Sequence, residues 1–289
     1  MNTILNFSPL AIFIIMLGVG MGVSVKNFIE VFQDFKVLLI GLLSQMVILP
    51  LIGFLFAIFS PVDLIFKLGI ILITSVPSAV TSNYITKLVS GNVALSVSLT
   101  AITASMSFLT IPFILIIVAP FAIDEASIFQ ELDFVKMSLK FLLITTIPVF
   151  IGVVINTKFS IFAKKINKYY SIFSLLLFVI IILAAWFSEW SVITGLYKSI
   201  GLLVTALALA VLTVSFILVN LLNLNVADKK TIIIESFVQN AAIAIIVGGL
   251  AFGAESGYLA IAALYALLQY KILLFLWAIE KFFKKFNNF

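Results

Sequence analysis

Apolar runs long enough to cross a lipid bilayer follow one another almost from end to end of this chain. A transmembrane helix needs about 20 predominantly apolar residues, and the stretches between the runs are short. Charged residues make up only 10% of the chain, against about 25% in soluble proteins. The sequence therefore predicts an all-α polytopic membrane protein, with residues 1–289 forming a single transmembrane unit.

Nine transmembrane helices are expected from these runs, and the lysines orient them. Short cytoplasmic loops of membrane proteins are enriched in lysine and arginine. The side richer in lysine should therefore be cytoplasmic, with the N-terminus outside and the C-terminus inside. The expected helices cover residues 8–23, 36–59, 65–89, 92–118, 136–155, 170–187, 200–222, 229–252 and 257–282. The lysine-rich side holds Lys26, Lys36, Lys87, Lys158, Lys164, Lys165, Lys168, Lys229, Lys230, Lys281, Lys284 and Lys285, whereas the other side holds Lys67, Lys136 and Lys198.

Two of the expected helices are interrupted by polar residues at their centres. The third contains the run from Thr74 to Asn83, where Pro77 removes one backbone donor. The eighth contains the run from Glu235 to Asn240 and, being five helices later, crosses the membrane in the opposite direction. Paired interrupted helices of opposite direction are typical of secondary transporters built from inverted repeats. We expect a five-helix inverted repeat that lacks its first helix, with repeats at residues 8–118 and 136–283.

Glu235 is the only acidic residue that lies well inside an apolar run. A carboxylate in the bilayer costs several kcal/mol unless a cation or a proton compensates it. Glu235 is therefore either a cation ligand or a protonated or salt-bridged structural residue. Neutral oxygen donors accompany it near the breaks, and two of them, one helical turn apart, share a face. Such oxygens suit a hard cation such as sodium. They belong to Ser82, Asn83, Ser96 and Thr100.

Several other polar side chains lie at membrane depth. Gln45 and Gln239 carry further uncharged oxygens and fit either ligation or packing. Thr103, Ser105, Ser107 and Thr110 form a stripe that we assign to helix packing. Lys271 lies far from both ends of the ninth helix, so we expect it to face the protein interior and to meet a carboxylate. That carboxylate is either Glu235 or part of the substrate.

The amino-acid composition excludes several kinds of reactive site. The chain has no histidine and no cysteine, which excludes disulfides, thiolate nucleophiles, sites built from cysteine or histidine, and histidine-based proton transfer. An intramembrane enzyme is therefore disfavoured. A sodium-coupled carrier for an organic anion is the first interpretation, and a proton-coupled or uncoupled carrier is the alternative. An inert scaffold or receptor gives no reason for polar groups at two helix breaks.

These same stretches resemble a known family. The runs Gln45–Pro50, Pro77–Asn83, Gly91–Thr100 and Glu235–Asn240, with Gly18–Gly22 near the start, are similar to those of the bile acid:sodium symporters. The resemblance extends from about Leu10 to about Leu276. It implies a core domain with two crossing discontinuous helices, a panel domain, and a bacterial inner-membrane protein that lacks the first of ten helices.

The resemblance also implies a set of functional residues. The first sodium site would use Ser82, Asn83, Ser96, Thr100 and Glu235. The second would use Gln45, Gln239 and Glu235, with backbone around Ser236 and Val238. The substrate, a small organic anion, would lie near Ala79, Val80 and Asn240, with Tyr270 and Lys271 beside it.

The chain departs from the family pattern around the substrate position. The family usually has a pair of glycines where this chain has Ser78-Ala79, and a threonine where it has Val80. A Trp-His-Asn stretch is replaced by Leu268-Gln269-Tyr270. These changes make a bile acid doubtful as the natural ligand, and a small carboxylate or sulfonate is the first expectation.

Overall fold

The computed structural model describes residues 2–23, 25–121, 129, 132–195, 197–252 and 257–286, and within this part the chain is helical without a β-strand. The helices of the first half are α1 (Asn2–Gly22), α2 (Val25–Gln33), α3 (Phe35–Leu43), η1 (Ser44–Ile48), α4 (Leu49–Phe59), α5 (Leu64–Ser75), α6 (Thr81–Leu88), α7 (Val93–Phe113), η2 (Ile114–Val118) and η3 (Ala119–Phe121). Those of the second half are α9 (Phe134–Phe141), η4 (Leu142–Thr146), α10 (Ile147–Lys158), α11 (Ser160–Ser188), α12 (Trp190–Gly195), α13 (Tyr197–Leu221), α14 (Val226–Phe237), α15 (Ala241–Phe252) and α16 (Tyr258–Phe286).

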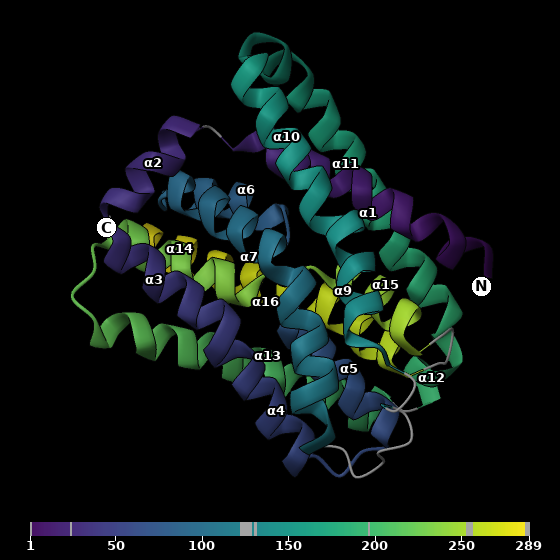
Figure 1. The fold of residues 1–289 in the computed structure, drawn as a ribbon. Coiled ribbons are helices and arrows are strands. Elements are labelled where there is room, and N and C mark those ends of the chain that lie inside the picture. The colour runs from purple at the N-terminus through teal and green to yellow at the C-terminus, as the bar shows by residue number, and fades with distance from the viewer. Residues whose placement is uncertain are drawn as a thin grey trace.

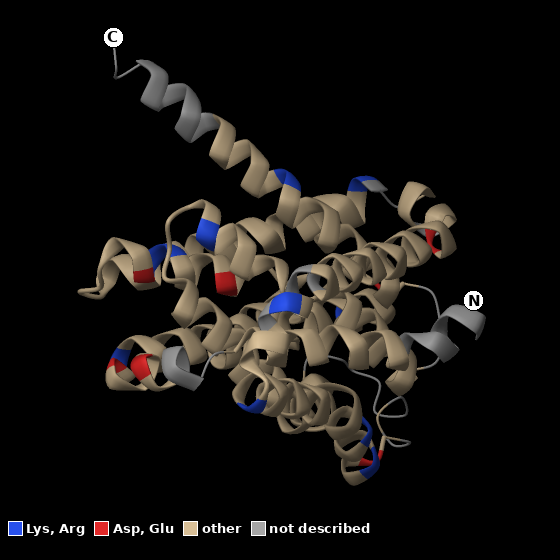
Figure 2. Ribbon diagram, turned by 90° about the horizontal axis from the view of Figure 1, so that it is seen from above, with Lys and Arg blue, Asp and Glu red and all other residues tan. Residues whose placement is uncertain are grey.

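The hydropathy of these helices agrees with a polytopic membrane protein. Five helical stretches in the described part are long and apolar enough to span a bilayer, and four shorter apolar helices accompany them. Every segment expected from the sequence overlaps one of these stretches. Figure 2 shows how few charged positions the ribbon carries. The five spanning stretches are Phe35–Phe59, Val93–Phe121, Phe134–Lys158, Lys198–Leu221 and Tyr258–Ala278, and the four shorter helices are Pro9–Gly22, Leu64–Ser75, Ile172–Ser188 and Ala241–Phe252.

Short π-helical turns interrupt three of the long stretches just before a proline. η1 is followed by Leu49-Pro50, η2 by Ala119-Pro120 and η4 by Ile147-Pro148. Proline has no N–H to donate to the preceding turn, and a shift in the hydrogen-bond register accommodates this loss. A π-bulge is such a shift, and π-bulges are frequent at functional sites. η1 carries Gln45, one of the residues predicted to bind sodium.

Helices α1, α10 and α11 pack together on one side of the molecule, at the upper right of Figure 1. A Cβ added at Gly20 would overlap the backbone of Val149, and one added at Gly152 would overlap the backbone of Leu17. Small residues of this kind allow membrane helices to approach closely. Tyr170 in α11 also donates to the carbonyl of residue 14 at 2.6 Å. These three helices therefore form one closely packed layer.

The two helix interruptions predicted from the sequence are buried inside the protein. The helices around them are α5, α7, α14, α15 and α16. The third predicted span is divided into α5 and α6 by residues 76–80, and the eighth into α14 and α15 by residues 238–240. In Figure 1 these helices lie between the α1–α10–α11 layer and α3, α4 and α13. The break residues Val76, Ala79 and Val238 are buried. The interrupted helices therefore place irregular backbone inside protein rather than against lipid.

Candidate functional site

The two helix breaks cross and hydrogen-bond to each other. The N–H of Ala79 donates to the carbonyl of Val238 at 3.0 Å, and the N–H of Asn240 donates to the carbonyl of Pro77 at 3.0 Å. Together they form an isolated antiparallel bridge between residues 78 and 239. Buried backbone groups need such partners in the absence of water. Each break therefore satisfies part of the backbone that the other one leaves free.

Helix α16 supplies side chains to the remaining backbone groups of the second break. Gln269 accepts from the N–H of Gln239 at 2.9 Å, and its Nε2 donates to the carbonyl of the same residue at 3.2 Å. Tyr265 Oη donates to the carbonyl of Phe237 at 3.0 Å. Gln269 is buried, and its two hydrogen bonds stabilise the backbone of the second break. Its place among the changes around the substrate position stays a prediction.

Glu235 lies at the C-terminal end of α14, surrounded by four hydroxyl groups. Its Oε1 accepts from Ser82 Oγ and, at 2.5 Å, from Ser96 Oγ. Its Oε2 accepts from Ser78 Oγ at 2.5 Å and from Thr100 Oγ1 at 2.9 Å. Glu235 is 0% exposed, and so are three of these partners. We call these five residues, together with Asn83, the Glu235 cluster.

The hydroxyl of Ser96 lies close to three other oxygens. Ser96 Oγ lies 2.5 Å from Glu235 Oε1, 2.7 Å from Asn83 Oδ1 and 3.3 Å from Thr86 Oγ1. A hydroxyl carries one proton and can donate it to only one acceptor at a time. The carboxylate and amide oxygens have no proton to share when Glu235 is ionised. A positive charge among these oxygens would stabilise the arrangement.

The donor set of the cluster fits a hard cation. It consists of carboxylate, amide and hydroxyl oxygens, and hard cations prefer such ligands. No nitrogen donor reaches Glu235 in the hydrogen bonds of the described residues. The C-terminal ends of half-helices, where the helix dipole is negative, are also where transporters bind sodium or protons. Glu235 sits in the last turn of such a half-helix.

The structure brings together all five residues predicted for the first sodium site. Ser96 and Thr100 lie one turn apart on α7 and both contact Glu235, as their spacing predicted. Sequence reasoning missed Ser78, which contacts both Glu235 and Thr100. The position of Ser78 directly after Pro77, in the interrupted part of the third helix, is the sequence feature that could have identified it. The assignment of sodium to these residues stays a prediction.

The residues predicted for the second sodium site surround the other side of the break. Both side-chain polar atoms of Gln45 and the Oε1 of Gln239 are buried without a hydrogen-bond partner in the described structure. Gln239 Nε2 donates to the carbonyl of Ser236 at 2.7 Å, whose hydroxyl lies 2.7 Å from Ser44 Oγ. Buried polar atoms without partners call for an explanation. A small pocket lined by Gln45 and Pro77 reaches this region.

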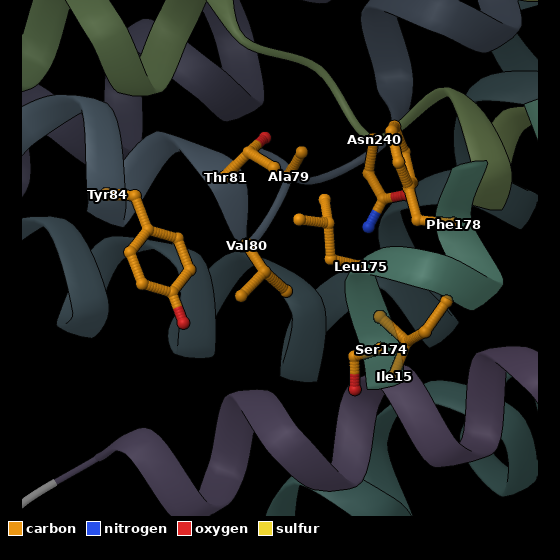
Figure 3. A pocket seen from close by; sticks show the side chains of 9 residues that line it. All are labelled: Ile15, Ala79, Val80, Thr81, Tyr84, Ser174, Leu175, Phe178 and Asn240. Carbon is orange, nitrogen blue, oxygen red and sulfur yellow. The ribbon is translucent and has the colours of Figure 1, made fainter. Parts of the chain in front are cut away.

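Three residues predicted to bind substrate line a pocket in front of the breaks. Ala79, Val80 and Asn240 meet side chains of α1 and α11 there, around a small pocket. Figure 3 shows Asn240 and Val80 facing this space, with Leu175 of α11 across it. The other lining residues are Ile15, Thr81, Tyr84, Ser174 and Phe178.

Tyr270 and Lys271 do not line this pocket. Tyr270 reaches its edge, because its Oη lies 2.7 Å from the hydroxyl of Thr81. Lys271 was expected to face the protein interior, but its side chain is exposed on α16. The helix turns by about 100° per residue, so the buried Gln269 points away from the face that carries Lys271. No ion pair of Lys271 with a carboxylate is found among the described residues.

Sequence comparisons find several proteins similar to this chain. The human ileal sodium/bile acid cotransporter is 26% identical over 84% of this chain and 68% of its own length. The mouse P3 protein is 28% identical over 84% of this chain, which spans only about half (51%) of that protein. An uncharacterized sodium-dependent transporter of Bacillus subtilis is 32% identical over 37% of this chain and 33% of its own length.

A family model covers most of the chain and includes the first break. The model describes the Sodium Bile acid symporter family and matches residues 9–196, which hold Pro77, Ser82, Asn83, Ser96 and Thr100. The two crossing breaks and the Glu235 cluster are thus found in a chain whose sequence matches a symporter family over more than half of its length. The chain belongs to the Sodium Bile acid symporter family.

Proposed function

We propose that this protein is a sodium-coupled symporter of an organic anion that works by alternating access. The observation that supports this proposal best is the Glu235 cluster. The carboxylate of Glu235 is fully buried. Among the described residues, its hydrogen-bond partners are the hydroxyl groups of Ser78, Ser96 and Thr100, at 2.5–2.9 Å, and that of Ser82. The family is one of symporters, and two of the relatives named above are called a cotransporter and a transporter rather than enzymes. Relatives named as sodium cotransporters support sodium as the cation.

The architecture of the proposal follows the sequence expectation. Nine spans would form a four-helix and a five-helix repeat in opposite orientations, with the N-terminus outside a bacterial inner membrane and the C-terminus in the cytoplasm. The layer of α1, α10 and α11 would be the panel domain, and the crossing helices would belong to the core domain. The two breaks, which lie in oppositely directed half-helices joined by backbone hydrogen bonds, support this arrangement.

A second sodium ion would bind where Gln45 and Gln239 bury amide oxygens that lack partners. The carbonyls around Ser236 and Val238 would complete that site, together with Glu235. Two sodium ions carried with one monovalent anion would move a net positive charge. Each such charge contributes about 2.3 kcal/mol per 100 mV of membrane potential.

The substrate would occupy the pocket between the breaks and the α1–α11 layer. Helices α6 and α15 begin at the breaks, at Thr81 and Ala241. Helix N-termini carry a partial positive charge and face anionic substrate groups in related transporter architectures. The lining is mostly apolar, with Asn240 as a buried amide. A small organic acid with an apolar body matches this combination. Lys271 lies outside the lining of this pocket, and its role as a partner of the anion stays a prediction.

A proton-coupled carrier is the second candidate. Its support is that Glu235 is fully buried, and a carboxylate inside the membrane needs a proton where no cation compensates its charge. The two candidates differ in which cation stabilises the folded protein, because a ligand that binds only the folded state raises its stability.

Transport and binding measurements together test the proposal. Purified protein should unfold at a higher temperature in sodium chloride than in an equal concentration of potassium chloride. Proteoliposomes should take up ²²Na⁺ faster when a small carboxylate or a small sulfonate is supplied on the same side, with a bile acid as the comparison ligand. Equal unfolding temperatures in the two salts, together with uptake driven by a pH gradient alone, would favour the proton-coupled carrier.

A further inference from the structure

The turn between α6 and α7 is tied to the first two turns of α14 by side-chain hydrogen bonds. Lys230 Nζ donates to the carbonyl of Val89 at 2.9 Å. Asn92 donates twice: its backbone N–H to Thr231 Oγ1 at 2.7 Å, and its Nδ2 to Asp228 Oδ1 at 2.8 Å. Asp228 is buried, and we call the contacts of Asn92 with Asp228 and Thr231 the α7–α14 latch.

The latch lies one helical turn from the Glu235 cluster on both helices that form it. Asn92 precedes Ser96 by four residues, and Thr231 precedes Glu235 by four residues. Residues four apart share a face of a helix and lie about 6 Å apart along its axis. Thr86 fills the space beside them, fully buried, with its Oγ1 3.3 Å from Ser96 Oγ. The latch therefore covers one end of the cluster directly.

A polar pocket lies on the other side of the latch. It has an empty volume of about 430 Å³ and includes Glu30, Asp34, Asn92 and Asp228 in its lining. Carboxylates around a cavity raise the local concentration of cations. The α6–α7 turn beside it has no room for a larger residue, because a Cβ at Gly91 would lie 2.9 Å from Thr231 Oγ1. A cation that left the cluster past Thr86 would emerge in this pocket.

We propose that the α7–α14 latch is the gate of the first cation site and that the acidic pocket is its release path to the cytoplasm. The proposal rests on the proposed sodium role of Glu235. Separation of Asn92 from Asp228 would open the path and, because Asn92 is the N-cap of α7, would also displace Ser96 from the cation. Opening of the release path and loss of Ser96 as a cation ligand are therefore linked. The same movement frees Asp228 Oδ1 to receive the ion, while Oδ2 still accepts from Asn225.

A cysteine reporter behind the gate tests this directly, because the natural chain contains no cysteine. Thr86→Cys places a thiol between the latch and the cluster. Its reaction with a membrane-impermeant thiol reagent is followed in inside-out and right-side-out vesicles, in potassium salts. Adding Asp228→Asn removes the charge that holds Asn92, and the labelling rate should rise about tenfold in inside-out vesicles only. A tenfold change corresponds to about 1.4 kcal/mol of gate stability.

Matched variants separate gating from general loosening. Asp133→Asn makes the same change at an acid near the start of a different helix, where it accepts the N–H of Lys136, and it should leave the labelling unchanged. Ser138→Cys is a buried reporter in α9 and should not respond to Asp228→Asn. Lys230→Met weakens the same turn without altering Asp228, and it should accelerate labelling in the same vesicles if Asp228→Asn does not fold.

Three results would overturn the proposal. They are an unchanged rate at Thr86→Cys in both gate variants, an equal rise at Ser138→Cys, or a rise in right-side-out vesicles. An unchanged rate would direct the ion instead past Asn83, the half-buried member of the cluster. Because the labelling is measured without sodium, it reports on the gate even if sodium proves not to be the transported cation. Sodium binding by the natural chain decides that separate question.

Discussion

Replacement of Glu235 by Gln is the most direct test of the cation site. The amide keeps the size of the side chain but removes the charge at the centre of four hydroxyl contacts. Two unit charges about 4 Å apart attract by about 4 kcal/mol at an effective dielectric constant of about 20. Loss of this attraction corresponds to roughly a thousandfold weaker binding of a monovalent cation. Glu235→Gln should therefore abolish sodium-dependent uptake at any practical sodium concentration.

The stability of the same variant separates a binding defect from a folding defect. A buried charge without a compensating cation is costly, and Gln removes that cost while its amide can still pair with the hydroxyls. In potassium chloride the variant should unfold at the same temperature as the natural chain or higher. For the natural chain, sodium at about 100 times its Kd should contribute about 2.7 kcal/mol, whereas the variant should show no sodium effect.

Glu189→Gln is the matched control. Glu189 is also a buried glutamate, 1% exposed, but it accepts from the N–H of Gly257 at 3.1 Å, away from the Glu235 cluster. Its replacement should preserve the stabilisation by sodium, whatever its effect on the unfolding temperature. If Glu235→Gln kept the full sodium-induced shift of the natural chain, the role of this carboxylate as cation ligand would be wrong.

Three further variants test other parts of the structure. Ser82→Ala removes one oxygen from Glu235 Oε1 and should raise the sodium concentration for half-maximal stabilisation about tenfold, a loss of about 1.4 kcal/mol; an unchanged value would remove Ser82 from the ligand set. Lys271→Met should weaken substrate-stimulated ²²Na⁺ uptake while the sodium-induced shift in unfolding temperature stays the same, and normal uptake would show that this exposed lysine is not a substrate partner. Gly20→Ala should destabilise the protein by about 1–3 kcal/mol, because its Cβ would overlap the backbone of Val149; thermal unfolding checks this, and a stability within about 0.5 kcal/mol of the natural chain would contradict close packing of α1 on α10.

The amino-acid sequence by itself determined that the chain forms apolar helices and that two of them are interrupted. Long apolar runs have to become helices in a membrane, because no water is present to satisfy the backbone. Polar residues inside two of these runs marked the interruptions that the structure has at residues 76–80 and 238–240. The four-residue spacing of Ser96 and Thr100 was enough to place both on one face of α7, because helix geometry is local.

Only the tertiary structure decided which side chains meet. Ser78 lies 157 residues from Glu235 in the chain, and Gln269 lies 30 residues from the backbone of Gln239 that it holds. Contacts of this kind depend on how each helix is rotated about its axis and where it crosses its neighbours, which hydropathy alone leaves undetermined. The same limit explains Lys271: its depth in the ninth segment was readable from the sequence, but the face of α16 that it occupies was not. That face is set by Tyr265 and Gln269, which turn inward because the break leaves backbone groups that need partners.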